Sequence, residues 1–184
     1  MRLFTRIALA AGLAFTGGSA LAQTQSPPPA PAAAPCSAPE YRTLDFWVGD
    51  WIAEWDASPG TPAGTGSNRV TRDEYGDCVI TEHFEGAGLK GHSISTYRPA
   101  GGVWRQTWMD DQGGYFDLRG GPVEGQDHVF YFETIRPRDN MPRQRMIWQD
   151  VTADSFTWRW QNKPATAAES DPWQDQWVVR YRRR

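Results

Sequence analysis

The sequence has few of the residues on which several common kinds of site depend. It holds two cysteines and three histidines in 184 residues, and neither type shows the spacing of zinc ligands. It also lacks a glycine-rich phosphate-binding loop and a Gly-x-Ser-x-Gly motif. The sequence therefore predicts no metal site, no cofactor and no catalytic residue.

Leucine is scarce after residue 40, where only Leu44, Leu89 and Leu118 occur, whereas all ten tryptophans lie in that part of the chain. Helical cores rely on leucine and alanine, while aromatic and β-branched residues are typical of strands. Residues 41–184 are long enough for one domain with a core and too short for two. This composition predicts a single all-β domain over residues 41–184.

Long apolar runs are missing as well. The longest, residues 7–15, is about half of the roughly 20 residues that a membrane-spanning helix needs. Arg2 and Arg6 precede this run, and small residues lead from it to Ala22. This pattern is typical of a secretory signal peptide, residues 1–22, cleaved after Ala22. We therefore expect a periplasmic or secreted protein with no stable membrane anchor; an uncleaved anchor is the alternative.

Residues 23–40 are rich in proline and alanine and contain almost nothing to bury, which predicts a disordered linker. Cleavage after Ala22 would remove Arg2 and Arg6, leaving 17 basic residues against 22 acidic ones. Nucleic-acid binding requires a basic surface, so the acidic mature chain is not expected to bind nucleic acid. No pattern indicates an oligomeric state.

Aromatic residues alternate with polar ones along many short runs, and turn sequences such as residues 99–102 and 111–114 separate the runs. Alternation with a period of two is typical of strands with one buried face. Three clear runs place these residues on one face: Trp51, Ala53 and Trp55; Trp104, Gln106 and Trp108; Phe156, Trp158 and Trp160. We predict an antiparallel up-and-down barrel of about ten strands, since closure removes exposed edges. A two-sheet sandwich is the alternative.

Four segments carry a resemblance to a known family. They are Phe46-Trp-Val-Gly-Asp-Trp51, Gly76-Asp-Cys-Val-Ile-Thr-Glu82, Gly91-His-Ser93, and Trp104-Arg-Gln-Thr-Trp-Met-Asp110 followed by Gly113. Together they resemble a widespread group of secreted bacterial proteins with a lipocalin-like domain of unknown function, over roughly residues 41–183. Gly49-Asp-Trp51 is similar to the Gly-x-Trp motif that opens lipocalins and related calycins.

This resemblance implies a lipocalin or calycin-like barrel in which Trp51 plugs the closed end. It also implies that an arginine near the last strand, Arg180 or Arg182, packs over that tryptophan, and Arg180 is our choice. The more distant nitrobindin-type barrels bind haem through a histidine near the C-terminal strand. Residues 177–184 contain no histidine, so haem is not expected.

The two cysteines, Cys36 and Cys78, are expected to form a disulfide, because an oxidising compartment and an even number of cysteines favour one. Such a bond would fasten the N-terminal segment to the barrel. Two free thiols are the alternative.

The predicted inner face carries polar residues among its aromatic ones. Burying them without partners is costly, so they must either bond one another in a packed barrel or line a cavity. Burial among aromatic rings should raise the pKa of Glu82. The candidate ligand-binding residues are Glu82, Phe84, His92, Gln106, Trp108, Trp158 and Trp160.

The favoured function is that of an exported barrel that binds a small apolar or amphipathic molecule. A calycin-type enzyme using Glu82 and His92 as acid and base is one alternative, although no motif indicates catalysis. A carbohydrate-binding or protein-interaction module is another, and it would need several exposed tryptophans as stacking surfaces.

Overall fold

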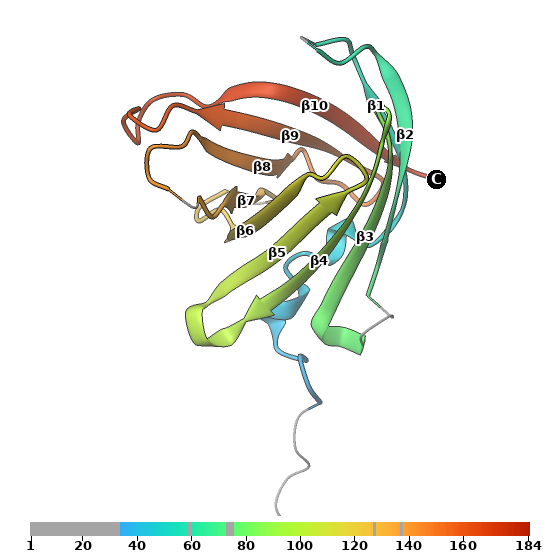
Figure 1. Cartoon of the computed structure of the whole chain (residues 1–184). Coiled ribbons are helices and arrows are strands. Elements are labelled where there is room, and N and C mark those ends of the chain that lie inside the picture. The colour runs from blue at the N-terminus through green and yellow to red at the C-terminus, as the bar shows by residue number, and fades with distance from the viewer. Residues whose placement is uncertain (1–33, 59, 73–75, 127, 137) are drawn as a thin grey trace, which may run out of the picture. The chain divides into compact units, whose positions relative to one another are not determined.

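The computed structural model describes residues 34–184 except residues 59, 73–75, 127 and 137. The predicted signal peptide and residues 23–33 of the predicted linker lie outside the described residues. Residues 34–40, the end of that linker, contain Cys36 and the start of a single helical turn. In the described part of the chain, regular structure consists of ten strands and four short 3₁₀ turns (Figure 1).

The ten strands form a closed barrel in which every strand pairs antiparallel with the next one along the chain. Strand β10 returns to pair with β1, placing Arg183 opposite Trp51. The all-β, up-and-down barrel expected from the sequence is therefore confirmed, and it is consistent with a lipocalin-like barrel. Its strands are β1 (Gly49–Trp55), β2 (Gly64–Thr71), β3 (Val79–Gly86), β4 (Leu89–Arg98), β5 (Val103–Asp110), β6 (Tyr115–Pro122), β7 (Phe130–Thr134), β8 (Arg143–Gln149), β9 (Ser155–Lys163) and β10 (Gln174–Arg183).

Alternation along the strands fills the barrel interior with aromatic rings, as Trp51, Ala53 and Trp55 illustrate on β1. On β10, Val179 and Tyr181 are buried in the same way. Many of these rings meet edge to face, the arrangement that their quadrupoles favour. The core is thus continuous around the barrel and is built mainly from aromatic side chains.

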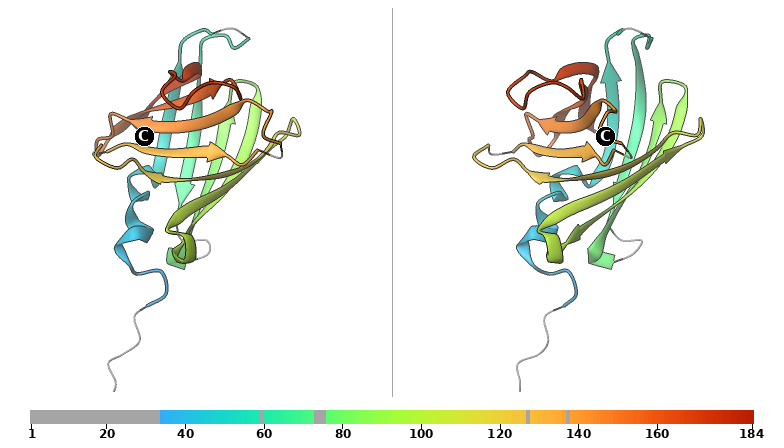
Figure 2. Two further views of the ribbon diagram at one scale, coloured as in Figure 1. Left: turned by 90° about the vertical axis from the view of Figure 1, so that its left-hand side faces the viewer. Right: turned by 60° about the vertical axis from the view of Figure 1, so that its left-hand side comes forward.

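Two 3₁₀ turns ahead of β1, η1 (Pro39–Arg42) and η2 (Asp45–Trp47), lie at one end of the barrel, called here the closed end (Figure 2). Trp47 of η2 is 2% exposed and meets Trp148 edge to face with ring centroids 5.3 Å apart. The other two turns are η3 (Gly76–Cys78) and η4 (Pro99–Gly101). No helix in the described part of the chain is long and apolar enough to cross a membrane.

Trp51 plugs the closed end, where its indole Nε1 donates a hydrogen bond to the carbonyl oxygen of Trp47 over 2.8 Å. The Arg183 guanidinium lies 4.3 Å from the centroid of the Trp51 ring. A side chain at Gly49 would collide with that guanidinium, since an added Cβ would lie 2.3 Å from Arg183 Nη1. The Gly-x-Trp sequence therefore leaves room for the arginine that covers the tryptophan.

The choice of Arg180 as that arginine is wrong. Residue 180 alternates with the buried Val179 and Tyr181, so its side chain faces outward and pairs with Asp56 over 2.8 Å. Arg183 lies on the same, inward face of β10 as Tyr181, so its side chain reaches over Trp51 at the closed end.

The predicted disulfide between Cys36 and Cys78 is confirmed, with the two Cα atoms 5.1 Å apart. It joins the segment ahead of η1 to the start of β3. The Thr96 hydroxyl of β4 also donates a hydrogen bond to the Cys78 carbonyl oxygen over 2.8 Å. The N-terminal segment that closes the barrel is thus covalently tied to β3, the strand that carries Glu82.

Candidate functional site

A cavity of about 240 Å³ lies inside the barrel. It runs from the buried Trp47 towards the end opposite η1 and η2, called here the distal end, where the partly exposed Leu89 and Asp110 line it. Eight of its twelve lining residues are aromatic. They are Trp47, Phe84, Trp108, Phe116, Trp158, Trp160, Trp177 and Tyr181; Leu89, Met146, Glu82 and Asp110 complete the lining.

Five of the seven predicted ligand-binding residues lie around this cavity: Glu82, Phe84, Trp108, Trp158 and Trp160. Gln106 points inward and is 2% exposed, but it lies behind the cavity wall and bonds its neighbours. The sequence interpretation missed other lining residues. Trp177 and Tyr181 could have been predicted, because they lie on one face of an alternating run. Asp110 could not, because it stands next to a turn, where alternation gives no direction.

Glu82 is the buried charged group of the cavity and is 8% exposed. Asn68 Nδ2 donates to its Oε1 over 2.7 Å, and Ser93 Oγ donates to its Oε2 over 2.6 Å. Behind this pair, Gln106 Nε2 donates to the hydroxyls of Ser93 and Ser95 over 3.2 and 3.0 Å. Among the described residues no cation forms a salt bridge with Glu82, so a cluster of neutral polar groups holds this carboxyl.

Burial raises the pKa of Glu82 from 4.5 to about 7, and the hydrogen bonds from Ser93 and Asn68 only partly oppose that rise. Burial also raises the pKa of Tyr181, with the nearby Glu82 carboxyl adding to the effect. Asp110 behaves in the opposite way. The indole N–H of Trp108 and the backbone amides around Gly114 lower its pKa. The cavity therefore has an ionised carboxylate near the distal end and a carboxyl that titrates near neutrality deep inside.

We expect stability to fall as Glu82 ionises. The folded-state pKa lies above the ordinary value, so the stabilising contribution of the neutral carboxyl is complete below about pH 4.5 and is lost as pH rises to about 7. Between pH 5 and pH 8 the free energy of unfolding should drop by about 2–3 kcal/mol from this group. In Glu82→Gln that drop should disappear, as urea unfolding at the two pH values would measure.

Glu85→Gln is the matched control for that measurement, because Glu85 lies on the same strand but faces outward and pairs with Lys90 over 3.0 Å. An equal pH dependence in the Glu82→Gln and Glu85→Gln variants would contradict the assignment.

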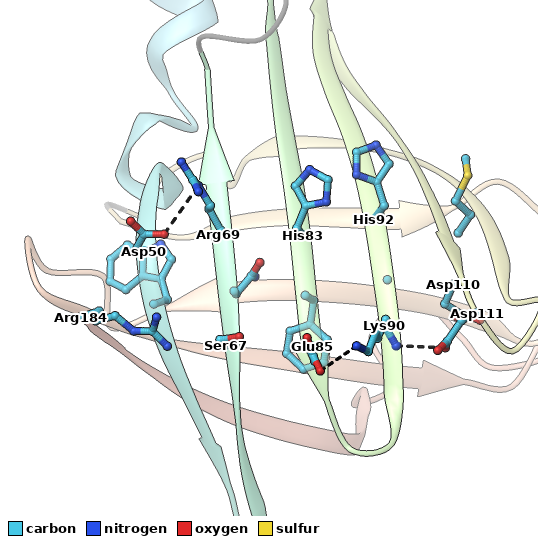
Figure 3. A pocket seen from close by; sticks show the side chains of 15 residues that line it. Asp50, Ser67, Arg69, His83, Glu85, Lys90, His92, Asp110, Asp111 and Arg184 are labelled. Carbon is cyan, nitrogen blue, oxygen red and sulfur yellow. Dashed lines mark hydrogen bonds and ion pairs between the residues drawn. The ribbon is translucent and has the colours of Figure 1, made fainter.

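The interior placement of His92 is wrong. His92 pairs with His83 across β3 and β4, and the two imidazole rings lie on the outer face with centroids 4.6 Å apart (Figure 3). Ser93 and Ser95 point inward instead, where they bond Glu82 and Gln106. Ile94, which lies on the same face of β4 as His92, points outward and is 38% exposed. The hydrogen bonds of Ser93 and Ser95 inside the barrel thus determine which face of β4 points inward.

A second hollow, of about 750 Å³, is lined chiefly by outward-facing side chains of β1–β4 and includes both histidines (Figure 3). Its charged side chains are largely paired with one another, as Asp50 is with Arg69 over 3.9 Å. These groups are exposed, and water screens exposed pairs strongly. Within the described residues, no group of three or more His, Cys, Asp or Glu side chains converges as metal ligands would. The interior cavity is the better candidate for a ligand site.

A scan against models of known protein families gives no match, and a search of curated proteins finds none either. A closed barrel with many buried aromatic residues fits a ligand-binding barrel.

Proposed function

We propose that this protein is an exported lipocalin-like barrel that binds a small apolar or amphipathic molecule in its interior. The observation that carries the proposal is the cavity of about 240 Å³ with aromatic walls and one buried carboxyl, Glu82. Ligand sites are typically apolar hollows with a few fixed polar groups. An apolar cavity of about 150 Å³ accommodates benzene, so this one suits a single ring with a short substituent.

The proposed location is the periplasm or the exterior of a bacterial cell. The signal-peptide pattern of residues 1–22 supports export, and the Cys36–Cys78 disulfide is compatible with an oxidising compartment. We also propose membership of the secreted bacterial family with a lipocalin-like domain. The packing of Arg183 over Trp51 next to Gly49 supports this assignment, since it is the arrangement that the resemblance implies.

The two alternatives have less support. An enzyme using Glu82 and His92 as an acid–base pair requires both groups to face one substrate, but the barrel wall lies between them. A carbohydrate-binding module needs exposed tryptophans. All ten tryptophans are in the described part of the chain, and each is buried or half-buried.

Gly91→Ala should close the cavity. An added Cβ at Gly91 would lie 1.9 Å from the Trp108 ring, so the indole must shift towards the cavity. We expect at least a tenfold loss of affinity for 2-phenylethanol, a neutral one-ring probe, measured by titration calorimetry. Native mass spectrometry of the protein purified from its own host should likewise show a bound molecule that the variant lacks.

Gly121→Ala is the control for that experiment, because nothing lies within 4 Å of an added Cβ at that position. It should bind 2-phenylethanol as the wild type does. A wild-type barrel that carries no molecule from its host and does not bind the probe would refute the proposed function.

A further inference from the structure

We propose that the interior cavity selects an organic cation, a small aryl-alkyl amine whose ammonium group pairs with Glu82 and whose ring packs among the tryptophans. This inference rests on the proposed function and adds to it the charge class of the ligand. The charge of the cavity, its hydrogen-bonding groups and its walls all favour such a ligand.

The lining of the cavity is acidic and has no compensating cation. Glu82 and Asp110 are its two ionisable carboxyls, and among the described residues no lysine, arginine or histidine lines it. Neither carboxyl forms a salt bridge within the described part of the chain. An anionic ligand would meet repulsion from both groups, whereas an ammonium group supplies the missing counter-charge in a low-dielectric interior.

Two buried hydrogen-bond acceptors in the polar cluster around Glu82 have no donor among the described residues. Asn68 and Gln106 are each 2% exposed, and both use their amide nitrogens within the cluster. Their oxygens, Asn68 Oδ1 and Gln106 Oε1, have no hydrogen-bond partner. Buried acceptors without donors are costly and uncommon. Neither residue lines the cavity, but both belong to the cluster that holds Glu82. Their unpaired oxygens therefore add negative potential there and favour a positively charged ligand.

The walls of the cavity suit a cation. Trp158 stacks near Trp160 with ring centroids 6.5 Å apart, and Trp177 meets Trp158 edge to face at 5.7 Å. Tryptophan faces attract ammonium groups, most strongly where water is excluded. The same rings hold the apolar part of an aryl-alkyl amine. A neutral alcohol of equal size would gain the packing but not the cation–π attraction or the ion pair.

Asp110 extends this negative potential to the distal end. Its carboxylate is fixed by the Trp108 indole N–H over 3.0 Å and by the Gly114 amide over 2.7 Å, and the low pKa of Asp110 keeps it ionised. An incoming cation thus meets one carboxylate near the exposed rim of the cavity and a second one deep inside. The groups packed around Glu82 are neutral near pH 7: Asn68 from β2, Ser93 from β4 and the Tyr181 phenol from β10.

The test is titration calorimetry of the full-length mature protein at pH 8 with three ligands of one size: 2-phenylethylamine, 2-phenylethanol and phenylacetate. We expect the amine to bind about tenfold more tightly than the alcohol, and phenylacetate to bind most weakly. Glu82→Gln should remove the preference for the amine over the alcohol. Glu85→Gln, which removes the same charge from the outer face of β3, should keep the preference.

A pH series on the wild type gives an answer that does not depend on a variant folding. The amine stays protonated from pH 6 to pH 8 while Glu82 ionises, so the preference for the amine should grow across that range. Equal affinities for amine and alcohol, or a preference that does not change with pH, would overturn the inference and leave the proposed function standing. Absence of binding by all three ligands, in a barrel that also carries no molecule from its host, would overturn both.

Discussion

Trp51→Ala is expected to lower the free energy of unfolding by about 3–5 kcal/mol, the usual cost of deleting a large aromatic side chain from a core. Trp51 is 1% exposed, and its ring lies 4.7 Å from that of Phe156 in an edge-to-face contact. The substitution would also remove the hydrogen bond to the Trp47 carbonyl and the surface on which Arg183 packs. Urea unfolding monitored by circular dichroism would measure the loss.

Trp173→Ala is the matched control for this prediction. Trp173 is half-buried on the outer face, where its ring lies 4.3 Å from the Arg145 guanidinium, and it takes no part in the core cluster. Its loss should cost about 1–2 kcal/mol, since a partly exposed cation–π contact and less buried area are removed. If the two variants lose equal stability, Trp51 is not the plug on which the closed end depends.

Breaking the Cys36–Cys78 disulfide is expected to cost about 3–4 kcal/mol. The bond closes a loop between residues separated by 42 positions, and its loss frees the unfolded chain by roughly the corresponding loop-closure entropy. Unfolding of the folded protein with and without dithiothreitol would measure the difference. Intact mass before and after reduction would show that the bond had been broken.

A Cys36→Ser, Cys78→Ser double variant provides the control for reduction. It should have the stability of the reduced wild type and should not respond to dithiothreitol. A wild-type midpoint that stays unchanged after complete reduction would contradict a stabilising role for the disulfide.

The fold could be predicted from the sequence because aromatic residues show which face of each strand points into the barrel. Along β1, β5 and β9, inward tryptophan and phenylalanine alternate with polar residues, and the structure keeps that phase. β4 has no aromatic residue between Gly91 and Thr96 to mark its phase. Its one large apolar residue there, Ile94, lies on the same face as His92 and points outward, so hydropathy favours the wrong face for this strand.

The cavity itself was beyond the reach of sequence patterns. Alternation says which side chains point inward, but the space left between them depends on rings brought together from distant strands. Phe116 of β6 lies 5.3 Å from Trp160 of β9, for example, although 44 positions separate the two residues. The rise in the pKa of Glu82 was predictable because the sequence placed this residue among aromatic side chains. Its hydrogen bond from Ser93 was not, because the sequence analysis had placed the opposite face of β4 inside the barrel.

The N-terminal and C-terminal segments of the described chain are both fixed at the closed end. The backbone amide of the last residue, Arg184, donates to the Asp50 carbonyl at the start of β1, and Cys36 is anchored at the start of β3. Leu89 and Asp110, at the exposed rim of the cavity, lie at the other end of their strands. A fusion partner, dye or sensor surface coupled through the C-terminus would therefore leave the distal end facing bulk solution. Immobilised protein should give the same ligand affinities as protein free in solution.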